Sequence, residues 1–167
     1  MNNMIDNFYD AMEAEDYKKL CDFNNHVKWF KPETIEANPR FSKTDVTAID
    51  KKNRKVHIEL KTREGELLDY RRYGDVLVEP RKLSTFTDIM ESGHTLDERC
   101  LYMNFVDDGV IIFNFNELGR SINIYTNHYH YNNGKQQYEH ETRFGLPYNK
   151  AIIYAIDKDT GEYIQVQ

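Results

Sequence analysis

Asp45, Glu59 and Lys61 are spaced so that their side chains could act together in one reaction. Side chains alternate between the two faces of a β-strand, so Glu59 and Lys61 are expected to point the same way. Asp45 lies on the preceding strand of a predicted hairpin, which brings its carboxylate towards that of Glu59. Two converging carboxylates repel each other, and a hard divalent cation such as Mg²⁺ relieves that repulsion. A lysine beside them can orient or deprotonate water and stabilise charge on a phosphate, a combination typical of metal-assisted phosphodiester hydrolysis. The alternative is a polar hairpin face with a surface ion pair.

The elements that must position these residues follow from hydrophobic periodicity. Alternating and β-branched residues predict strands over 45–50 and 55–62, joined as a hairpin by the polar turn 51–54. Apolar residues at helical spacing predict a helix over 3–24, and a proline start with a glycine stop predicts another from Pro80 to about Ser92. We expect residues 63–74 to be irregular. The other predicted elements are strands at 27–30, 75–79, 99–106, 110–115 and 151–156.

Composition and the order of these elements predict the number of domains and the fold class. The chain has 167 residues, of which 40% are hydrophobic and 30% charged, which predicts one domain with a real core. No linker or internal repeat divides residues 1–167. The predicted order of one helix, several strands, a second helix and further strands indicates an α+β (mixed α/β) domain with a mixed central sheet.

A short motif in this chain resembles that of the PD-(D/E)XK nuclease superfamily. It consists of Thr44-Asp45, followed fourteen positions later by Glu59-Leu60-Lys61, with Thr44 where the family name has Pro. The predicted element order is similar to that family over about residues 5–115. The resemblance implies a restriction-endonuclease-like core, and residues 116–167 would then be a β-rich C-terminal elaboration. It implies that Asp45 and Glu59 hold Mg²⁺, with Mn²⁺ able to substitute, and that Lys61 assists the attacking water. It also implies DNA as the partner.

Two further groups of charged residues extend the candidate site. Many such nucleases add an acidic residue from the first helix, and Asp16 is the candidate because it falls on the apolar stripe, where a carboxylate needs a partner. The alternative for Asp16 is an edge residue paired with a lysine or arginine. Basic residues around the hairpin and the next helix are candidate phosphate contacts, or else a solvated face: Lys51, Lys52, Arg54, Arg63, Arg81 and Lys82. Lys82 is also a candidate for the site itself, because its helix start follows a neighbouring strand.

A second candidate metal site lies in a hairpin predicted around Asn133-Gly134. A two-residue turn there would place His128 opposite Glu139 and His130 opposite Gln137. Two histidines and a glutamate suit a transition metal, but a fourth ligand is not visible, so we favour a Tyr-rich surface hairpin. Such a hairpin would serve as a dimer contact or a stacking platform.

Charge and cysteine content limit the function classes. A net charge of −6 argues against coating nucleic acid through bulk charge, although a local basic surface is compatible with it. No Gly-rich phosphate loop or Gly-x-Ser-x-Gly setting exists. Cys21 and Cys100 match no metal-ligand spacing, and the N-terminus lacks the features of a signal peptide. We therefore expect a reduced, cytoplasmic protein without a membrane partner.

The sequence thus predicts a Mg²⁺-dependent nuclease that hydrolyses phosphodiester bonds in DNA. The alternative is a catalytically weak or inactive nuclease-fold protein that binds nucleic acid or protein. A resolvase-like member of the family would be a two-fold homodimer, because a junction needs two symmetric cuts.

Overall fold

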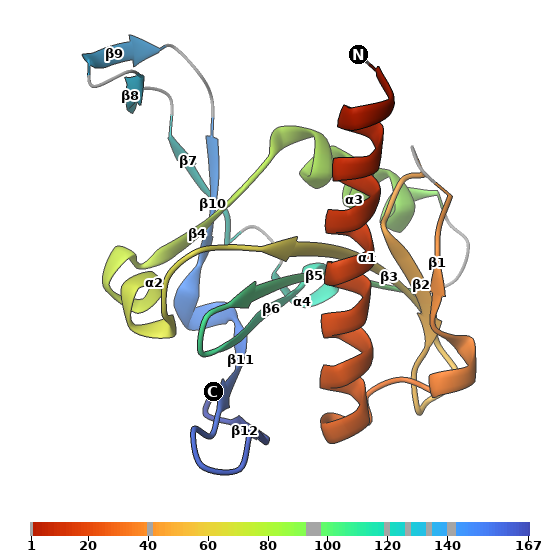
Figure 1. Ribbon diagram of the computed structural model, residues 1–167. Coiled ribbons are helices and arrows are strands. Elements are labelled where there is room, and N and C mark those ends of the chain that lie inside the picture. Colours follow the sequence, from red (N-terminus) through yellow and green to blue (C-terminus); the bar gives the residue numbers. More distant parts are fainter. Residues whose placement is uncertain are drawn as a thin grey trace.

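A seven-stranded mixed sheet forms the centre of the protein in the computed structural model (Figure 1). The structure describes residues 2–39, 42–92, 98–118, 121–125, 128–132, 135–139 and 143–167, with side chains described in 13–124 and 143–167 of these. The sheet order is β1-β2-β3-β5-β6-β11-β12, in which β3 and β5 are parallel and all other neighbours are antiparallel. Its strands are β1 (Glu36–Ala37), β2 (Val46–Ile49), β3 (Lys55–Thr62), β5 (Arg99–Val106), β6 (Gly109–Asn114), β11 (Ile152–Ile156) and β12 (Tyr163–Gln165). The predicted α+β class with a mixed sheet is confirmed.

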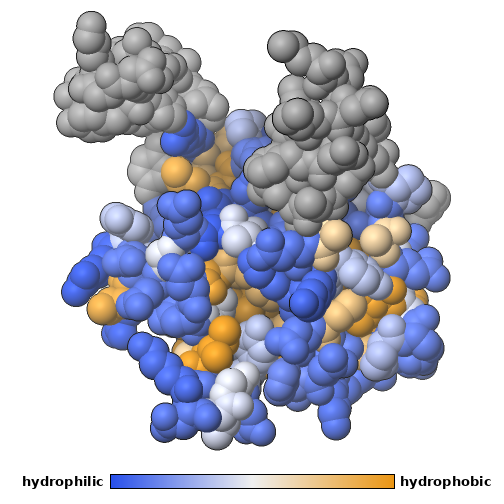
Figure 2. All heavy atoms as spheres, in the orientation of Figure 1, coloured by the Kyte–Doolittle hydropathy of each residue, from blue (hydrophilic) through white to orange (hydrophobic). Residues whose placement is uncertain are grey.

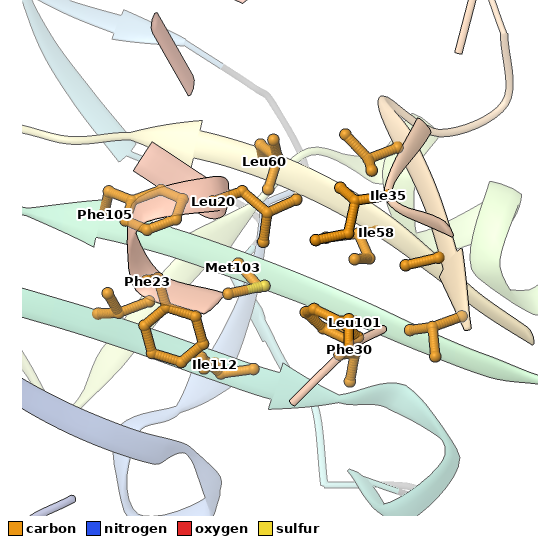
Figure 3. Packing of buried hydrophobic residues seen from close by; sticks show 14 of the residues in the cluster. Leu20, Phe23, Phe30, Ile35, Ile58, Leu60, Leu101, Met103, Phe105 and Ile112 are labelled. Carbon is orange, nitrogen blue, oxygen red and sulfur yellow. The ribbon is translucent and has the colours of Figure 1, made fainter. Parts of the chain in front are cut away.

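The long helix α1 (Asn2–Val27) covers one face of this sheet, in front of it in Figure 1. Leu20 and Phe23 of α1 pack onto alternate residues of the central strands, among them Ile58, Met103 and Ile112 (Figure 3). These side chains are almost completely buried, and each such residue stabilises the fold by about 2 kcal/mol through removal of apolar surface from water. The predicted helix over 3–24 is confirmed and extends three residues further.

The other face of the sheet packs against short helices and a second sheet. The helices are α2 (Leu67–Tyr73), α3 (Pro80–Glu91) and α4 (Phe115–Leu118), and the three-stranded sheet β4-β10-β7 is formed by Asp75–Val78, Arg143–Pro147 and Asn123–Tyr125. Phe86 of α3 and Val76 of β4 are buried here against Tyr102 and Phe113. Because β5 and β6 are covered on both faces, nearly all their residues are buried, which explains their almost continuous apolar sequence. Hydrophilic residues cover most of the described surface seen in Figure 2.

The predicted hairpin of residues 45–62 is confirmed as β2 and β3, with Val46 opposite Ile58. Its turn is organised by Asp50, whose Oδ1 accepts hydrogen bonds from the backbone N–H groups of Lys52 (2.8 Å) and Arg54 (2.9 Å). Asp50 Oδ2 accepts from Arg54 Nε at 2.7 Å. Burial alone would raise the pKa of Asp50, but these hydrogen bonds and the Arg54 charge outweigh it and lower the pKa below its ordinary value.

Asp50→Ala is expected to lower the free energy of unfolding by about 2 kcal/mol at pH 7, because it removes a charged acceptor from three donors. Since folding lowers the pKa of Asp50, the stabilisation is present above the ordinary carboxyl pKa and is lost as pH falls through the folded value. Urea unfolding at pH 7 and pH 2.5 measures both effects, with the exposed Lys51→Ala as control. An equal loss at both pH values would contradict this role of the ionised carboxylate.

Two local predictions are wrong for identifiable reasons. Residues 63–74, expected to be irregular, contain α2, whose N-terminal amide on Leu67 is bonded to Asp108 Oδ1 at 2.7 Å. Asp108 lies in the β5–β6 turn, so this contact is invisible to local sequence patterns. The local signals for α2 are the hydrogen bond from Glu66 N–H to Asp69 Oδ2 at 3.1 Å and the left-handed Gly74 at its end. Residues 27–30 form no strand, because the Asn24 side chain bonds both backbone groups of Phe30 and leaves only an isolated bridge between Phe30 and Asp50.

The remaining predicted elements are confirmed with small shifts. Helix α3 spans Pro80–Glu91, and the strands predicted at 75–79, 99–106, 110–115 and 151–156 are β4, β5, β6 and β11. The chain after residue 116 contains the strands β7 to β12, including β8 (His128–Asn132) and β9 (Lys135–Glu139). It also contains the 3₁₀ turn Tyr148–Lys150, and a second 3₁₀ turn, Pro32–Thr34, lies between α1 and β1. Because β11 and β12 belong to the central sheet, this part of the chain helps to build the core itself.

Candidate active site

A cavity of about 410 Å³ lies where the C-terminal end of β3 meets α1, the start of β2 and the start of α3. Its wall combines acidic side chains with basic ones, and we call it the carboxylate cavity. The acidic members are Glu13, Asp16, Asp45, Glu59 and Glu79, and the basic members are Lys61, Arg81 and Lys82. The structure therefore brings all three predicted catalytic residues to one hollow.

Asp45 is held against β3 by its backbone and by its side chain. Its N–H donates to Ile58 O at 3.1 Å, and its Oδ2 accepts from the N–H of Leu60 at 2.8 Å. These contacts fix the Asp45 carboxylate beside Glu59, close enough for its negative charge to raise the pKa of Glu59. The predicted approach of Asp45 to Glu59 is confirmed.

Glu59 is buried at the base of the carboxylate cavity, with only 4% of its surface exposed. Its Oε1 forms an ion pair with Lys82 Nζ, while its Oε2 has no hydrogen-bond partner among the described residues. A buried carboxylate oxygen without a partner is costly, and such an atom in a native structure calls for an explanation. A proton shared with Asp45 would satisfy this oxygen, and so would a cation bound between the two carboxylates.

Burial, together with the negative charge of Asp45 and a hydrogen bond shared with it, raises the pKa of Glu59 to about 7 against the opposing effect of Lys82. The cation of Lys82 therefore does not fully compensate the two carboxylates. Without another cation, Glu59 is partly protonated near neutral pH. Carboxyl groups with a pKa raised in this way gather at functional sites more often than elsewhere.

Lys82 reaches Glu59 because α3 begins directly after β4. Pro80 occupies the first turn of α3, where its missing N–H removes no hydrogen bond, and Lys82 follows in the same turn. Lys82 is a sequence-predicted candidate both for phosphate binding and for the site itself. The structure places it in the site, on the most buried carboxylate.

Lys61 shares a face of β3 with Glu59 but lies nearer the rim. Its Nζ is 3.8 Å from Glu79 Oε1, and nearly half of its side chain is exposed. Such a group can reach solvent and a substrate at the mouth of the cavity. The predicted common face of Glu59 and Lys61 is confirmed.

Asp16 lines the carboxylate cavity but is engaged with the end of β3. Its Oδ1 accepts a hydrogen bond from Thr62 Oγ1, which in turn accepts from Lys19 Nζ at 2.9 Å. Within the described ranges, no group of three or more His, Cys, Asp or Glu side chains is close enough to hold one metal ion. The structure therefore leaves Asp45 and Glu59 as the paired candidate ligands, with Asp16 farther along the wall.

The two carboxylates nevertheless suit Mg²⁺. This ion commonly uses one or two protein carboxylates and keeps several waters or substrate phosphate oxygens as its other ligands. A cation bound beside Asp45 and Glu59 would offset the negative charge that Lys82 leaves uncompensated. The donor set therefore fits the ion that the sequence predicts.

The other predicted basic residues divide into separate groups. Arg81 lines the carboxylate cavity, whereas Arg63 points inward, with Nε on Asn104 Oδ1 at 2.7 Å and Nη2 on Tyr102 Oη at 2.9 Å. Lys51, Lys52 and Arg54 lie at the hairpin turn, at the opposite end of β3 from Lys61. The structure therefore does not unite the six in one surface.

The histidine candidates lie elsewhere. His57 Nε2 is 2.9 Å from Glu98 Oε2, so this strand histidine is hydrogen-bonded to a carboxylate, and it does not line the carboxylate cavity. The backbone of β8 and β9 pairs His128 with Glu139 and His130 with Gln137, which confirms the predicted register. Their side chains, and with them the second candidate metal site, fall outside the described residues.

Sequence reasoning missed the uncharged part of the wall. Tyr17, Thr62 and Tyr102 all line the carboxylate cavity. Tyr102 is directly beside Glu59 in the parallel β3–β5 pair, a neighbour that no local pattern indicates. Thr62 follows Lys61 by one position, and only its contact with Asp16 distinguishes it.

Comparisons with known proteins do not extend this picture. No protein-family model, curated protein or solved structure matches the chain. None of the described helices has both the length and the hydrophobicity needed to cross a membrane. The geometry of the carboxylate cavity is therefore the main basis for inferring a function.

Proposed function

We propose that the protein is a Mg²⁺-dependent nuclease that hydrolyses phosphodiester bonds in DNA. The observation that carries the proposal is the buried Glu59, which lies beside Asp45 with one carboxylate oxygen unpaired in a cavity rimmed by basic side chains. Carboxylates for a cation and basic groups for a phosphate are the two requirements of this chemistry.

Each residue has a role that follows from its position. Asp45 and Glu59 hold the ion, which when bound neutralises phosphate charge and makes water more acidic. Lys61, at the rim, orients the attacking water and offsets the negative charge that develops on the phosphate. Arg81 binds a phosphate of the strand, and Lys82 favours the charged form of Glu59 and orients it.

The position of this site within the fold supports a PD-(D/E)XK relationship, which belongs to the same proposal. Asp45 directly precedes β2 and Glu59 lies on its antiparallel neighbour β3, a leading helix lies across the sheet, and α3 follows the hairpin. In a restriction-endonuclease-like core of this kind, the cavity would open towards the phosphate backbone of the substrate.

The test is a cleavage assay with Mg²⁺, Mn²⁺ or EDTA on plasmid, linear duplex, single-stranded DNA, a four-way junction and RNA. We expect cutting of DNA with either metal and none with EDTA. Asp45→Asn and Lys61→Ala should each reduce the rate at least about a hundredfold. The matched controls are Asp88→Asn and Lys43→Ala, which remove exposed charges outside the cavity and should cut like the wild type.

The outcomes separate the parts of the proposal. Preferential cutting of RNA would overturn DNA as the substrate, and symmetric cutting of the junction by a species of twice the chain mass would support a homodimer. Equal activity of Asp45→Asn and the wild type would overturn the assigned site.

A binding module is the second candidate function, and the Lys82–Glu59 ion pair favours it because it already supplies Glu59 with a cation. Such a module would use the same basic rim without cutting. No cleavage of any substrate, together with no heat of Mg²⁺ binding in calorimetry, would establish this alternative over the nuclease.

A further inference from the structure

A second hollow, of about 300 Å³, lies at the opposite end of β3 from the carboxylate cavity. It is formed where the chain leaves α1, beside the β2–β3 turn and the start of β5. Its wall contains five basic side chains and the only tryptophan of the protein: Lys28, Lys51, Lys52, Arg54, Arg99 and Trp29. We call it the tryptophan hollow.

The tryptophan hollow is positively charged although the whole chain carries −6. Its two acidic members are Asp50 and Glu117. Asp50 is already bonded to Arg54, and Glu117 accepts a hydrogen bond from Asn114 Nδ2 at 2.7 Å. Among the described residues, Lys51, Lys52 and Arg99 form no ion pair, so their charge remains available to an anion.

Arg99 gives the strongest indication of a ligand. Its Nε is buried and has no hydrogen-bond partner among the described residues. A buried guanidinium N–H without an acceptor is destabilising, and its planar fork matches the oxygens of a phosphate. Arg99 lines the hollow, so an anion bound there would give its guanidinium group an acceptor.

Trp29 provides a rigid apolar wall beside these charges. Its Nε1 donates to Tyr154 Oη at 3.0 Å, and its ring packs edge-on against Phe23 and Phe30. The indole is therefore fixed before any ligand arrives, so little side-chain freedom is lost on binding. Leu101 and Ile152 extend the apolar wall. A ligand that suits the hollow combines a phosphate with a flat or apolar group.

We propose that the tryptophan hollow binds a nucleotide, with its phosphate on Arg99, Lys51 and Lys52 and its base or sugar against Trp29. Its volume, at the lower end of small-ligand sites, suits one nucleotide. The same chemistry is offered by a free mononucleotide and by the terminal nucleotide of a strand. The proposal does not rest on hydrolysis in the carboxylate cavity.

The test is titration of the full chain, in EDTA and low salt, with thymidine 5′-monophosphate, thymidine, inorganic phosphate and a six-nucleotide thymidylate strand. Calorimetry gives the affinity. The ¹H–¹⁵N spectrum shows whether the probe binds beside Trp29, because a protein with one tryptophan yields one indole N–H signal. We expect the monophosphate or the strand to bind and shift this signal, and thymidine without phosphate to bind at least tenfold more weakly.

Two variants link the binding to the hollow. Arg99→Gln should weaken it at least tenfold, and Lys52→Gln, an exposed change that leaves the core intact, should weaken it several-fold. Arg81→Gln in the carboxylate cavity is the matched control and should leave the indole shift unchanged. Binding of the monophosphate identifies a free nucleotide as the ligand, and binding of the strand alone identifies a strand terminus. No heat and no indole shift with any probe, or binding insensitive to both variants, would overturn the proposal.

Discussion

Glu59→Gln is expected to reduce Mg²⁺-dependent DNA cleavage by a factor of about a thousand or more while it stabilises the metal-free protein at pH 8. The loss of activity follows because the amide carries no charge for the ion. The gain in stability follows because the neutral amide can occupy the buried position without the cost of an ionised carboxylate beside Asp45. Lys82 can still donate to the remaining side-chain oxygen.

The sign of the pH dependence follows from the raised pKa of Glu59. Folding shifts it from 4.5 to about 7, so the folded protein holds this proton more tightly than the unfolded chain. The wild type is therefore most stable, relative to the variant, below pH 4.5, and it loses that advantage as pH rises to 7. A pKa shift of this size changes the free energy of unfolding by about 3 kcal/mol over this pH range.

Urea unfolding of both proteins in EDTA at pH 4.5, 6 and 8, together with cleavage assays in Mg²⁺, measures the two effects. Asp88→Asn, which removes an exposed carboxylate of α3, serves as the activity control. If the stability difference between wild type and Glu59→Gln were independent of pH, the carboxyl would not be held against ionisation by its surroundings. If the variant cleaved DNA normally, Glu59 would not hold the ion.

Gly109→Ala is expected to lower the free energy of unfolding by about 3 kcal/mol, the upper end of the range for overpacking. Gly109 begins β6 opposite Ala155 of β11. A Cβ there would overlap the carbonyl oxygen of Tyr154 and come within 2.7 Å of Leu67 Cδ1. The clash with backbone cannot be relieved by rotating a side chain, so β6 or β11 must shift.

Urea midpoints followed by circular dichroism test this expectation. Gly161→Ala is the control, because Gly161 has a φ of +72° and open space around it, so alanine there costs only about 1 kcal/mol of backbone strain. Leu67→Ala in the Gly109→Ala background should not restore stability, since the clash with Tyr154 remains and a buried leucine side chain is lost. A stability equal to that of Gly161→Ala would show that the sheet absorbs the extra methyl group.

Sequence patterns predicted the hairpin, α1 and α3 because each depends on local chemistry. The alternation of residues 45–50 and 55–62 defines two strands, and the polar turn between them fixes their register. The same alternation placed Glu59 and Lys61 on one face. Helix α2 was missed although Glu66, Asp69 and Gly74 supply local cap signals, because the helix is only 7 residues long and its first amide is bonded to a distant side chain, that of Asp108.

The sequence by itself determined that Asp45, Glu59 and Lys61 lie close together, since all three belong to one hairpin whose pairing is set by residues near in the chain. Only the tertiary structure decided what surrounds them. Lys82 meets Glu59 because β4 and α3 pack against the sheet, and Tyr102 lies beside Glu59 because β5 pairs in parallel with β3. Tertiary contacts also bury Glu59, which raises its pKa, and place Trp29 and Arg99 in the wall of one hollow. These contacts join residues far apart in sequence, and local periodicity does not encode them.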